Sequence, residues 1–276
     1  MNHPIGVFDS GYGGLTVLRE IVRKLPQYDY VYLGDNARAP YGPRSFETVY
    51  RYTLQCVRQL FEMGCPLVVL ACNTASAKAL RNIQQLDLPR MADPSRRVLG
   101  VIRPTTEVIG TYSRTGSVGI LATRGTVLSE SYVVEIAKFY PELTVVQEAC
   151  PMWVPLVENG EHLGPGADYF VRECLDQLFA QSGQLDTLLL ACTHYPLLLP
   201  KIQQYVPTNV TIVSQGPIVA DSLADYLTRH PELADRCSQT GQIHFYTTDS
   251  ADAFGQMAGV FWDGPVRAET LVLNER

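Results

Sequence analysis

The chain has 276 residues, of which 46% are hydrophobic and 18% charged, and its formal net charge is −6. This composition is typical of a soluble globular protein that buries a sizeable core in one large domain or two small ones. The acidic balance and the scattered lysines and arginines argue against a nucleic-acid-binding protein. No apolar run approaches the roughly 18 residues that a membrane span needs. The first residues lack a basic segment and a long apolar run, so we expect no signal peptide and a cytoplasmic location.

Seven cysteines and five histidines carry the candidate reactive groups. No two cysteines form a Cys-x-x-Cys pair and the histidines do not cluster, so we expect no zinc site and no metal cofactor. In a reducing compartment the cysteines should be free thiols. Most free cysteines are simply small buried hydrophobes, and we interpret five of the seven in this way.

Short apolar runs alternate along the chain with stretches whose apolar residues recur at helical spacing. We expect strands at residues 5–8, 30–33, 67–71, 98–102, 117–122, 144–147, 187–191, 210–213 and 243–246. The clearest helical patterns cover residues 15–25, 46–63 and 75–86. Strands that alternate with helices predict an α/β fold with parallel sheets.

One near-repeat divides the chain into two similar halves. Residues 67–74 (LVVLACNT) parallel residues 187–194 (TLLLACTH), and in each an apolar strand ends in Ala-Cys. The two cysteines, Cys72 and Cys192, lie 120 positions apart, about the length of one α/β lobe. We therefore expect two similar lobes, each with a thiol at the carboxyl end of a strand, where open α/β sheets bind ligands.

The two thiols suggest a specific chemistry. A cysteine that opens a helix lies in the positive field of the helix N-terminus, which should lower its pKa. Nucleophilic catalysis needs one thiolate and a separate base. Racemisation at an α-carbon instead needs two acid–base groups on opposite faces, and thiols with tuned pKa values can serve as either acid or base.

Two further loops follow strands of the first half. Asp9 and Ser10 begin a glycine-rich turn that could hold a carboxylate with backbone N–H groups and a hydroxyl, with Asp9 in an acid–base relay. A capped structural turn explains the same residues. Tyr41 and Gly42 lie after the second strand, where a ligand loop and a plain turn are equally consistent.

Two residues of the second half complete the candidates. His194 lies two residues after Cys192 and could orient or protonate groups near that thiol. Glu158, judged by its neighbours alone, is only a surface carboxylate.

At these residues the sequence resembles the glutamate racemases of the aspartate/glutamate racemase superfamily, over nearly the whole chain. The matching motifs are residues 6–15 (GVFDSGYGGL), 32–35 (YLGD), 40–42 (PYG), 71–75 (ACNTA), 121–123 with 126–127 (LAT, TV), 155–158 (PLVE) and 191–197 (ACTHYPL). The first and last are highly specific as a set.

The resemblance implies an isomerase that interconverts L- and D-glutamate without pyridoxal phosphate or metal and supplies D-glutamate for peptidoglycan. It implies that Cys72 deprotonates the D-isomer and Cys192 the L-isomer, and that Asp9, Glu158 and His194 assist. It further implies that the substrate is bound, by backbone or side chain, by Asp9, Ser10, Tyr41, Gly42, Asn73, Thr74, Thr126, Thr193 and His194.

The family fold that the resemblance implies consists of two α/β lobes related by pseudo-twofold symmetry, with the active site between them. We expect a discontinuous first lobe at residues 1–97 plus 212–276 and a second lobe at 98–211. A homodimer is also expected, with no nucleic-acid or membrane partner. The sequence departs from the family pattern at residues 214–217, at Arg103 and in the stretch 86–97.

Three alternatives stay open at this point. A related racemase could act on aspartate, although the Thr193-His194 pair favours glutamate. A Cys–His–Asp hydrolase would use one cysteine with His194 and Asp9 and would need no second thiol. A solute-binding module also has two α/β lobes that close on an amino acid, but it would not need paired thiols.

Overall fold

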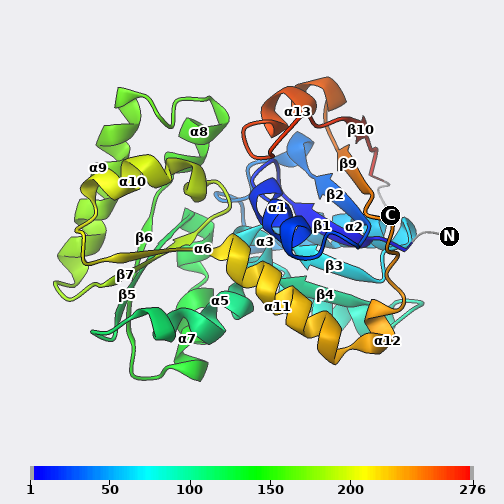
Figure 1. Ribbon diagram of the computed structural model, residues 1–276, viewed down its shortest axis with the longest axis horizontal. Helices are drawn as coiled ribbons and strands as arrows, with labels where there is room; N and C mark the ends of the chain where they lie inside the picture. The colour runs from blue at the N-terminus through cyan, green and yellow to red at the C-terminus, as the bar shows by residue number, and fades with distance from the viewer. Residues whose placement is uncertain (1–2, 274–276) are drawn as a thin grey trace. The chain divides into compact units, whose positions relative to one another are not determined.

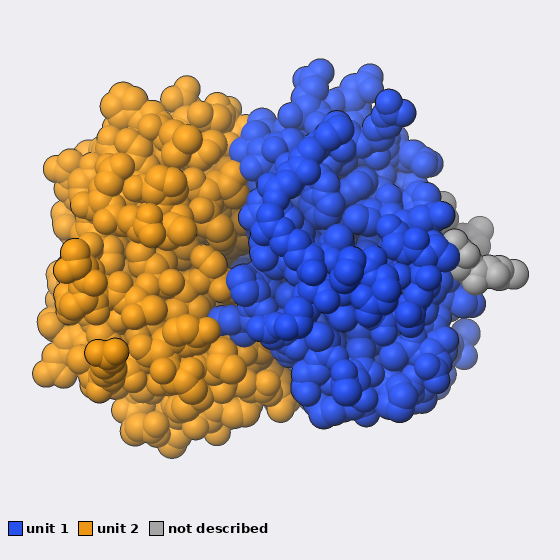
Figure 2. All heavy atoms as spheres, viewed as in Figure 1, with its two compact units in different colours: residues 1–101, 216–276 blue, residues 102–215 orange. Residues whose placement is uncertain are grey.

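A computed structural model describes residues 3–273 of the chain. The chain forms two compact units: unit 1 comprises Met1–Val101 and Gly216–Arg276, and unit 2 comprises Ile102–Gln215 (Figure 2). Each unit contains one parallel sheet, so the prediction of two α/β lobes is confirmed.

The sheet of unit 1 has six strands in the order β10-β9-β2-β1-β3-β4, and every pairing is parallel (Figure 1). The strands are β1 (Ile5–Asp9), β2 (Tyr30–Gly34), β3 (Leu67–Leu70), β4 (Arg97–Gly100), β9 (Ile243–Thr247) and β10 (Ala268–Thr270). Every residue of β1, β2 and β3 is buried. These strands are therefore covered on both faces, which explains why they are continuous apolar runs without alternation.

The helical segments of unit 1 connect these parallel strands. They are α1 (Leu15–Lys24), a 3₁₀ turn (Asn36–Arg38), α2 (Phe46–Glu62), α3 (Asn73–Lys78), α4 (Leu80–Asn82), a π-helical turn (Ile83–Asp87), a second 3₁₀ turn (Leu88–Arg90), α11 (Gln215–Arg229), α12 (Pro231–Ala234) and α13 (Ala251–Ala258). Ser45 is the N-cap of α2, and its hydroxyl accepts a hydrogen bond from the Thr48 backbone N–H at 3.2 Å. Its apolar face packs against β1, β2 and β3.

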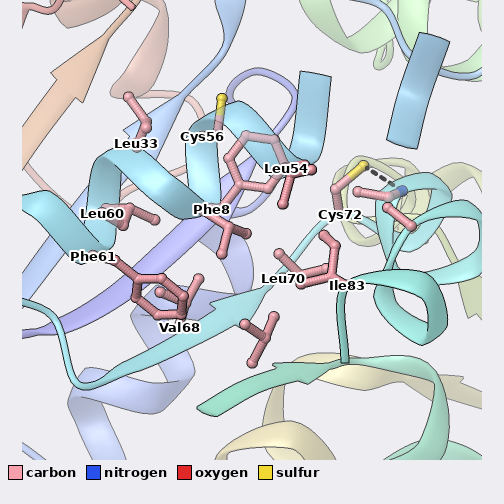
Figure 3. Close-up of a cluster of buried hydrophobic side chains, with 14 of the residues drawn as sticks. Phe8, Leu33, Leu54, Cys56, Leu60, Phe61, Val68, Leu70, Cys72 and Ile83 are labelled. Atoms are coloured by element: carbon pink, nitrogen blue, oxygen red, sulfur yellow. Dashed lines mark hydrogen bonds between the residues drawn. The ribbon is translucent and has the colours of Figure 1, made fainter. Parts of the chain in front are cut away.

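A hydrophobic cluster lies between α2, α3 and the central strands of unit 1. Phe8 of β1, Leu60 of α2 and Leu70 of β3 are fully buried within it (Figure 3). Cys72 belongs to the same cluster, and a hydrogen bond from the Ala75 N–H reaches its sulfur. The core of unit 1 therefore extends directly to the candidate catalytic thiol.

The sheet of unit 2 has four parallel strands in the order β6-β5-β7-β8. The strands are β5 (Ser117–Ala122), β6 (Thr144–Ala149), β7 (Thr187–Ala191) and β8 (Thr211–Ser214). The helical segments are α5 (Ile102–Val108), a 3₁₀ turn (Ile109–Tyr112), α6 (Arg124–Leu128), α7 (Ser131–Phe139), α8 (Trp153–Glu158), α9 (Pro165–Gln181), a 3₁₀ turn (Tyr195–Leu198) and α10 (Leu199–Tyr205). The two central strands, β5 and β7, are fully buried, and α9 packs against β5 and β6.

Several elements differ from the expectations. The helix expected over residues 75–86 is broken into α3, α4 and the π-helical turn. Strand β10 was not expected, because Ala268–Thr270 is a short edge strand without an apolar run. The strand expected at 98–102 ends at Gly100, and α5 begins at Ile102.

Strand pairing explains where the two units divide. Strand β4 pairs with β3 and so belongs to unit 1, whereas β8 pairs with β7 and so belongs to unit 2. The chain therefore passes from unit 1 to unit 2 after β4, between residues 101 and 102. It returns to unit 1 after β8, between residues 215 and 216.

Candidate active site

The carboxyl edge of the unit 1 sheet carries three polar residues from neighbouring strands. Asp9 is the last residue of β1, Asp35 comes directly after β2, and Cys72 comes two residues after the end of β3. All three are buried, with exposed fractions of 1%, 0% and 6%. The glycine-rich turn wraps around Asp9, whose Oδ2 accepts a hydrogen bond from the Gly11 N–H at 3.0 Å.

Cys72 forms the N-cap of α3. Its Sγ accepts a hydrogen bond from the Ala75 N–H at 3.4 Å and lies 3.5 Å from Ser10 Oγ. The turn at Asp9 and the start of α3 therefore meet at this thiol. Asn73 and Thr74, which begin α3, are buried beside it.

The sequence-based expectation that the helix start would lower the pKa of Cys72 is wrong. Burial, followed by the negative charge of Asp9, raises the pKa of Cys72 to about 12, even though Ser10 and the Ala75 N–H stabilise the thiolate. Burial disfavours the charged form of the thiol, and a six-residue helix does not compensate for it. At neutral pH Cys72 is a neutral thiol.

The loop after β2 is held by Asp35. The Tyr41 hydroxyl donates a hydrogen bond to Asp35 Oδ2, Arg38 Nε donates to the same oxygen at 2.7 Å, and Thr248 Oγ1 donates to Oδ1 at 2.8 Å. The phenol of Tyr41 is thereby turned into the core, with a pKa raised well above its usual range chiefly by burial. The phenol is therefore held by Asp35 within the core of unit 1.

The carboxyl edge of the unit 2 sheet holds the second thiol. Residues Ala122 and Ala191 are register partners, so Thr123 and Cys192 leave the sheet side by side. Cys192 is 6% exposed. Unlike Cys72 it does not cap a helix, because His194 separates it from the 3₁₀ turn that begins at Tyr195. The two thiols are thus equivalent in their strands but not in their helices.

His194 connects Cys192 to a carboxylate. Its Nδ1 lies 4.0 Å from Cys192 Sγ, and its Nε2 lies 2.9 Å from Glu158 Oε1. Burial lowers the pKa of His194, but the hydrogen bonds and charges of Cys192 and Glu158 outweigh burial and raise it to about 10. At neutral pH the ring is therefore an imidazolium, and it lies beside Cys192.

Glu158 ends α8 and is partly buried. Its local sequence gave no functional signal, because its partner His194 lies 36 positions further along the chain. Only the motif of residues 155–158, read through the family resemblance, indicated this carboxylate.

Two threonines border the same edge of unit 2. Thr123 caps α6 by accepting a hydrogen bond from the Thr126 N–H at 3.4 Å, and their hydroxyl oxygens are 3.1 Å apart. Thr126 is fully buried, and Thr193 lies between Cys192 and His194 with its Oγ1 3.5 Å from His194 Nδ1. These hydroxyls and the adjacent backbone suit the recognition of a carboxylate.

The structure therefore gathers the candidates into two groups, one in each unit. Unit 1 brings together Asp9, Ser10, Tyr41, Gly42, Cys72, Asn73 and Thr74, and unit 2 brings together Thr126, Glu158, Cys192, Thr193 and His194. Sequence reasoning missed Arg38 and Thr248, which hold Asp35, and Tyr132 and Gln215, which lie near Cys192. A partner more than 200 positions away, as Thr248 is from Asp35, leaves no local signal.

Neither edge shows a grouping of metal ligands. Among residues 3–273, no three His, Cys, Asp or Glu side chains are close enough together to hold a metal ion. Over the same residues, no helix has the length and apolar character that a bilayer crossing requires.

Parallel α/β units with polar and titratable residues at the carboxyl ends of their strands are typical of α/β enzymes. The profile of the Asp/Glu/Hydantoin racemase family matches residues 5–223. The chain belongs to the Asp/Glu/Hydantoin racemase family.

Individual relatives agree with this assignment. The chain is 41% identical over 259 residues to the glutamate racemase of Shouchella clausii, covering 94% of this chain and 90% of that protein. It is 41% identical over 261 residues to the glutamate racemase of Geobacter metallireducens, covering 94% and 93%.

Solved structures give the same result. A glutamate racemase isoform from Bacillus anthracis superposes with a TM-score of 0.88 at 33% identity, covering 98% of each chain. The Francisella tularensis glutamate racemase in complex with D-glutamate gives a TM-score of 0.87 at 28% identity, covering 100% of this chain and 99% of that one. The aspartate racemase of Picrophilus torridus, at 18% identity and a TM-score of 0.54, shares the fold alone.

Proposed function

We propose that this protein interconverts L- and D-glutamate by moving protons between Cα of the substrate and two thiols, Cys72 and Cys192. The observation that carries the proposal is the pair of buried thiols at equivalent strand ends, each beside its own acid–base partner. The glutamate racemases to which the chain is similar support glutamate as the substrate.

In the direction from L to D, Cys192 acts as the base. Its thiolate removes the Cα proton and becomes a thiol, and the neutral Cys72 thiol delivers its own proton to the opposite face of the carbanion and becomes a thiolate. The two protonation states support this direction, because the His194 imidazolium lies beside Cys192 while burial and Asp9 keep Cys72 protonated. Each proton transfer is completed on the protein, so no cofactor takes part.

In the direction from D to L, the roles reverse and Cys72 must act as the base. A substrate ammonium group near Asp9 would offset the negative charge that raises the pKa of Cys72. We therefore assign Asp9 to the Cys72 side of the reaction. His194, backed by Glu158, serves the Cys192 side.

The hydroxyls and backbone groups next to the two thiols bind the substrate in this proposal. Several N–H and O–H groups that each donate a hydrogen bond bind a carboxylate well, because hydrogen bonds to a charged acceptor are strong. We assign this role to Ser10, Tyr41, Gly42, Asn73, Thr74, Thr126 and Thr193, with the polar groups of Asp9 and His194 contributing.

The biological setting belongs to the same proposal. We propose that the enzyme works in the cytoplasm as a homodimer, that it needs no nucleic-acid or membrane partner, and that its D-glutamate enters peptidoglycan. A reducing compartment is consistent with seven free cysteines.

A circular-dichroism assay tests the reaction directly. Purified enzyme in EDTA, without pyridoxal phosphate, should racemise both L- and D-glutamate to an equal mixture, and in D₂O the product should gain one deuterium at Cα. Faster turnover of aspartate than of glutamate would assign the related activity instead. Binding of glutamate with no deuterium exchange, or trapping of an acyl-enzyme, would overturn the proposal.

A further inference from the structure

A buried polar network lies next to the second thiol. Leu190 of β7 and Ser214 of β8 are register partners, so the residues that follow them, Ala191 and Gln215, stand side by side at the sheet edge. Adjacent strands are about 4.8 Å apart. Gln215 therefore lies one strand spacing from the residue that precedes Cys192, within the 214–217 segment that departs from the family pattern.

Gln215 is the first residue of α11 and the last residue of unit 2, and it is hydrogen-bonded to two helices of unit 2. Its Nε2 donates hydrogen bonds to Thr105 Oγ1 of α5 at 3.0 Å and to the Tyr132 hydroxyl of α7 at 2.6 Å. Gln215 is 4% exposed, and Thr105 and Tyr132 are fully buried. Buried hydrogen bonds of this kind fix the side chains that make them, because breaking one leaves an unsatisfied polar group.

Tyr132 is hydrogen-bonded to Gln215 and also interacts electrostatically with Cys192. Its pKa is raised, chiefly by burial and also by the nearby Cys192, while the hydrogen bond from Gln215 opposes the rise. The phenol therefore keeps its proton throughout the working pH range. It presents a neutral O–H dipole close to the thiol that must become charged.

The direction of the Gln215 hydrogen bond orients that dipole. A phenol has one hydrogen to donate, and an amide NH₂ group can only donate. Because the Tyr132 oxygen accepts from Gln215, its own hydrogen is directed away from Gln215. A hydroxyl whose hydrogen is turned toward a sulfur favours the thiolate, since hydrogen bonds to the charged form stabilise it.

We infer that Gln215 is a positioning residue for the Cys192 half of the reaction, acting by orienting the Tyr132 hydroxyl toward the thiol that removes the proton from L-glutamate. This inference rests on the proposed function, in which Cys192 is that base.

The other groups that interact with Cys192 lie outside α5 and α7, the two helices to which Gln215 donates hydrogen bonds. They are the His194 imidazolium with Glu158 behind it, the Thr193 hydroxyl, and the uncharged Tyr195 and Cys150, whose pKa values burial raises well above their usual ranges. A change produced by a Gln215 variant should therefore pass through Tyr132.

The test compares Gln215→Met, Tyr132→Phe and the double variant. Methionine keeps the length of glutamine but donates no hydrogen bond, and phenylalanine removes only the hydroxyl. In each single variant the acidic limb of the kcat/KM profile for L-glutamate should move up by about one pH unit, the size expected for a hydrogen bond to a charged group. KM should change by less than about twofold, and the double variant should shift no further than Tyr132→Phe alone.

Isotope effects identify which thiol is affected. The primary isotope effect on kcat/KM should rise with Cα-deuterated L-glutamate, whose deuteron goes to Cys192, and should not rise with the D-isomer. Gln203→Glu and Tyr169→Phe, at exposed positions of α10 and α9, serve as controls and should match the unchanged enzyme.

Two failures are distinguishable. If the unchanged enzyme does not racemise glutamate, the proposed function and this inference fail together. If it does, but folded Tyr132→Phe leaves the pH limb and isotope effects unchanged, or the effects of the two single variants simply add, Gln215 has only a structural role.

Discussion

At the residue scale, the two thiols are similar in sequence but have different neighbours. Cys72 is neutral because burial and Asp9 both oppose the thiolate. Cys192 lies beside a cationic His194. An enzyme that removes a proton on one face and returns one on the other requires one basic and one acidic group at the start of each turnover. In the mechanism that we propose, the different neighbours of the two thiols would supply these two roles.

Replacing either thiol should therefore abolish catalysis in both directions. We expect Cys72→Ser and Cys192→Ser each to reduce kcat/KM at least about a thousandfold, because a serine hydroxyl is far too weak an acid–base group near pH 7. Since L- and D-glutamate are equally stable, kcat/KM must fall equally for both. Circular dichroism measures the rate of racemisation. The control is Cys237→Ser, because Cys237 is a buried cysteine of unit 1 whose thiol donates a hydrogen bond to the Leu233 carbonyl. Wild-type turnover in either catalytic variant would contradict the two-thiol mechanism.

The pair of Glu158 and His194 makes a prediction about pH. The pKa of His194 is raised from 6.5 to about 10, so the stabilisation that the charged pair provides is complete below pH 6.5 and is lost as the pH rises through 10. Glu158→Gln should lower the pKa of His194 by about one unit or more, measured by NMR of the ring.

The same variant should lose less unfolding free energy than the wild type between pH 6 and pH 10.5. Glu161→Gln, a carboxylate on the neighbouring surface loop, is the matched control. An unchanged His194 titration in Glu158→Gln would show that the carboxylate does not hold the imidazolium.

At the element scale, close packing of strand ends and helix starts places the site residues. Strands β1, β2 and β3 are buried throughout, and their positions follow from continuous apolar runs in the sequence. The helical segments that follow the strands are less regular than expected. The helix expected over 75–86 is divided into three segments, and Cys192 is followed by a 3₁₀ turn rather than an α-helix. Apolar spacing predicts which face is buried but does not predict which hydrogen-bond pattern closes a turn.

Gly14 shows how tightly one such junction is packed. A Cβ at this position would lie 2.5 Å from the Cβ of Asp9 and 3.0 Å from the Cβ of Ala71, the residue before Cys72. We expect Gly14→Ala to displace Asp9, to reduce kcat at least about tenfold, and to lower the melting temperature by several degrees, as overpacking does. Activity assays and thermal unfolding measure both effects.

Gly166 provides the control for this substitution. It also lies at a helix start, in α9, but no atom is within 4 Å of a Cβ built there. Gly166→Ala should leave activity and melting temperature nearly unchanged. Equal effects of the two substitutions would refute the packing argument.

At the scale of the whole molecule, the chain completes unit 1 only at its end. Strand β9 pairs with β2 at five positions, and β10 pairs with β9. The fully buried Phe254 packs against Tyr32. The Tyr32 hydroxyl donates a hydrogen bond to the Gly11 carbonyl in the glycine-rich turn. The last segment therefore supports the turn that carries Asp9 and Ser10.

Truncation after Gly241 should consequently destroy unit 1. Removing β9, α13 and β10 would expose the apolar residues of β2 and the aromatic contacts around Tyr32, and we expect an inactive, aggregating protein without cooperative unfolding. Near-UV circular dichroism and light scattering, with the full-length chain in parallel, measure this. A soluble truncated protein with native near-UV signal would show that unit 1 does not need its last strands.

The sequence by itself determined the α/β class, most of the strands, the two thiols and the family, because these depend on local apolar runs and on short motifs. It could not determine that Cys72 is neutral, since burial and Asp9 act across 63 positions of chain. Nor could it bring Glu158 to His194 or Gln215 to Tyr132, whose hydrogen bonds span 36 and 83 positions. Side chains from separate strand ends meet only when parallel strands align their carboxyl ends at one edge. The fold therefore decided which partners surround the residues that the motifs had indicated, and with them the neutral state of Cys72 and the cationic state of His194.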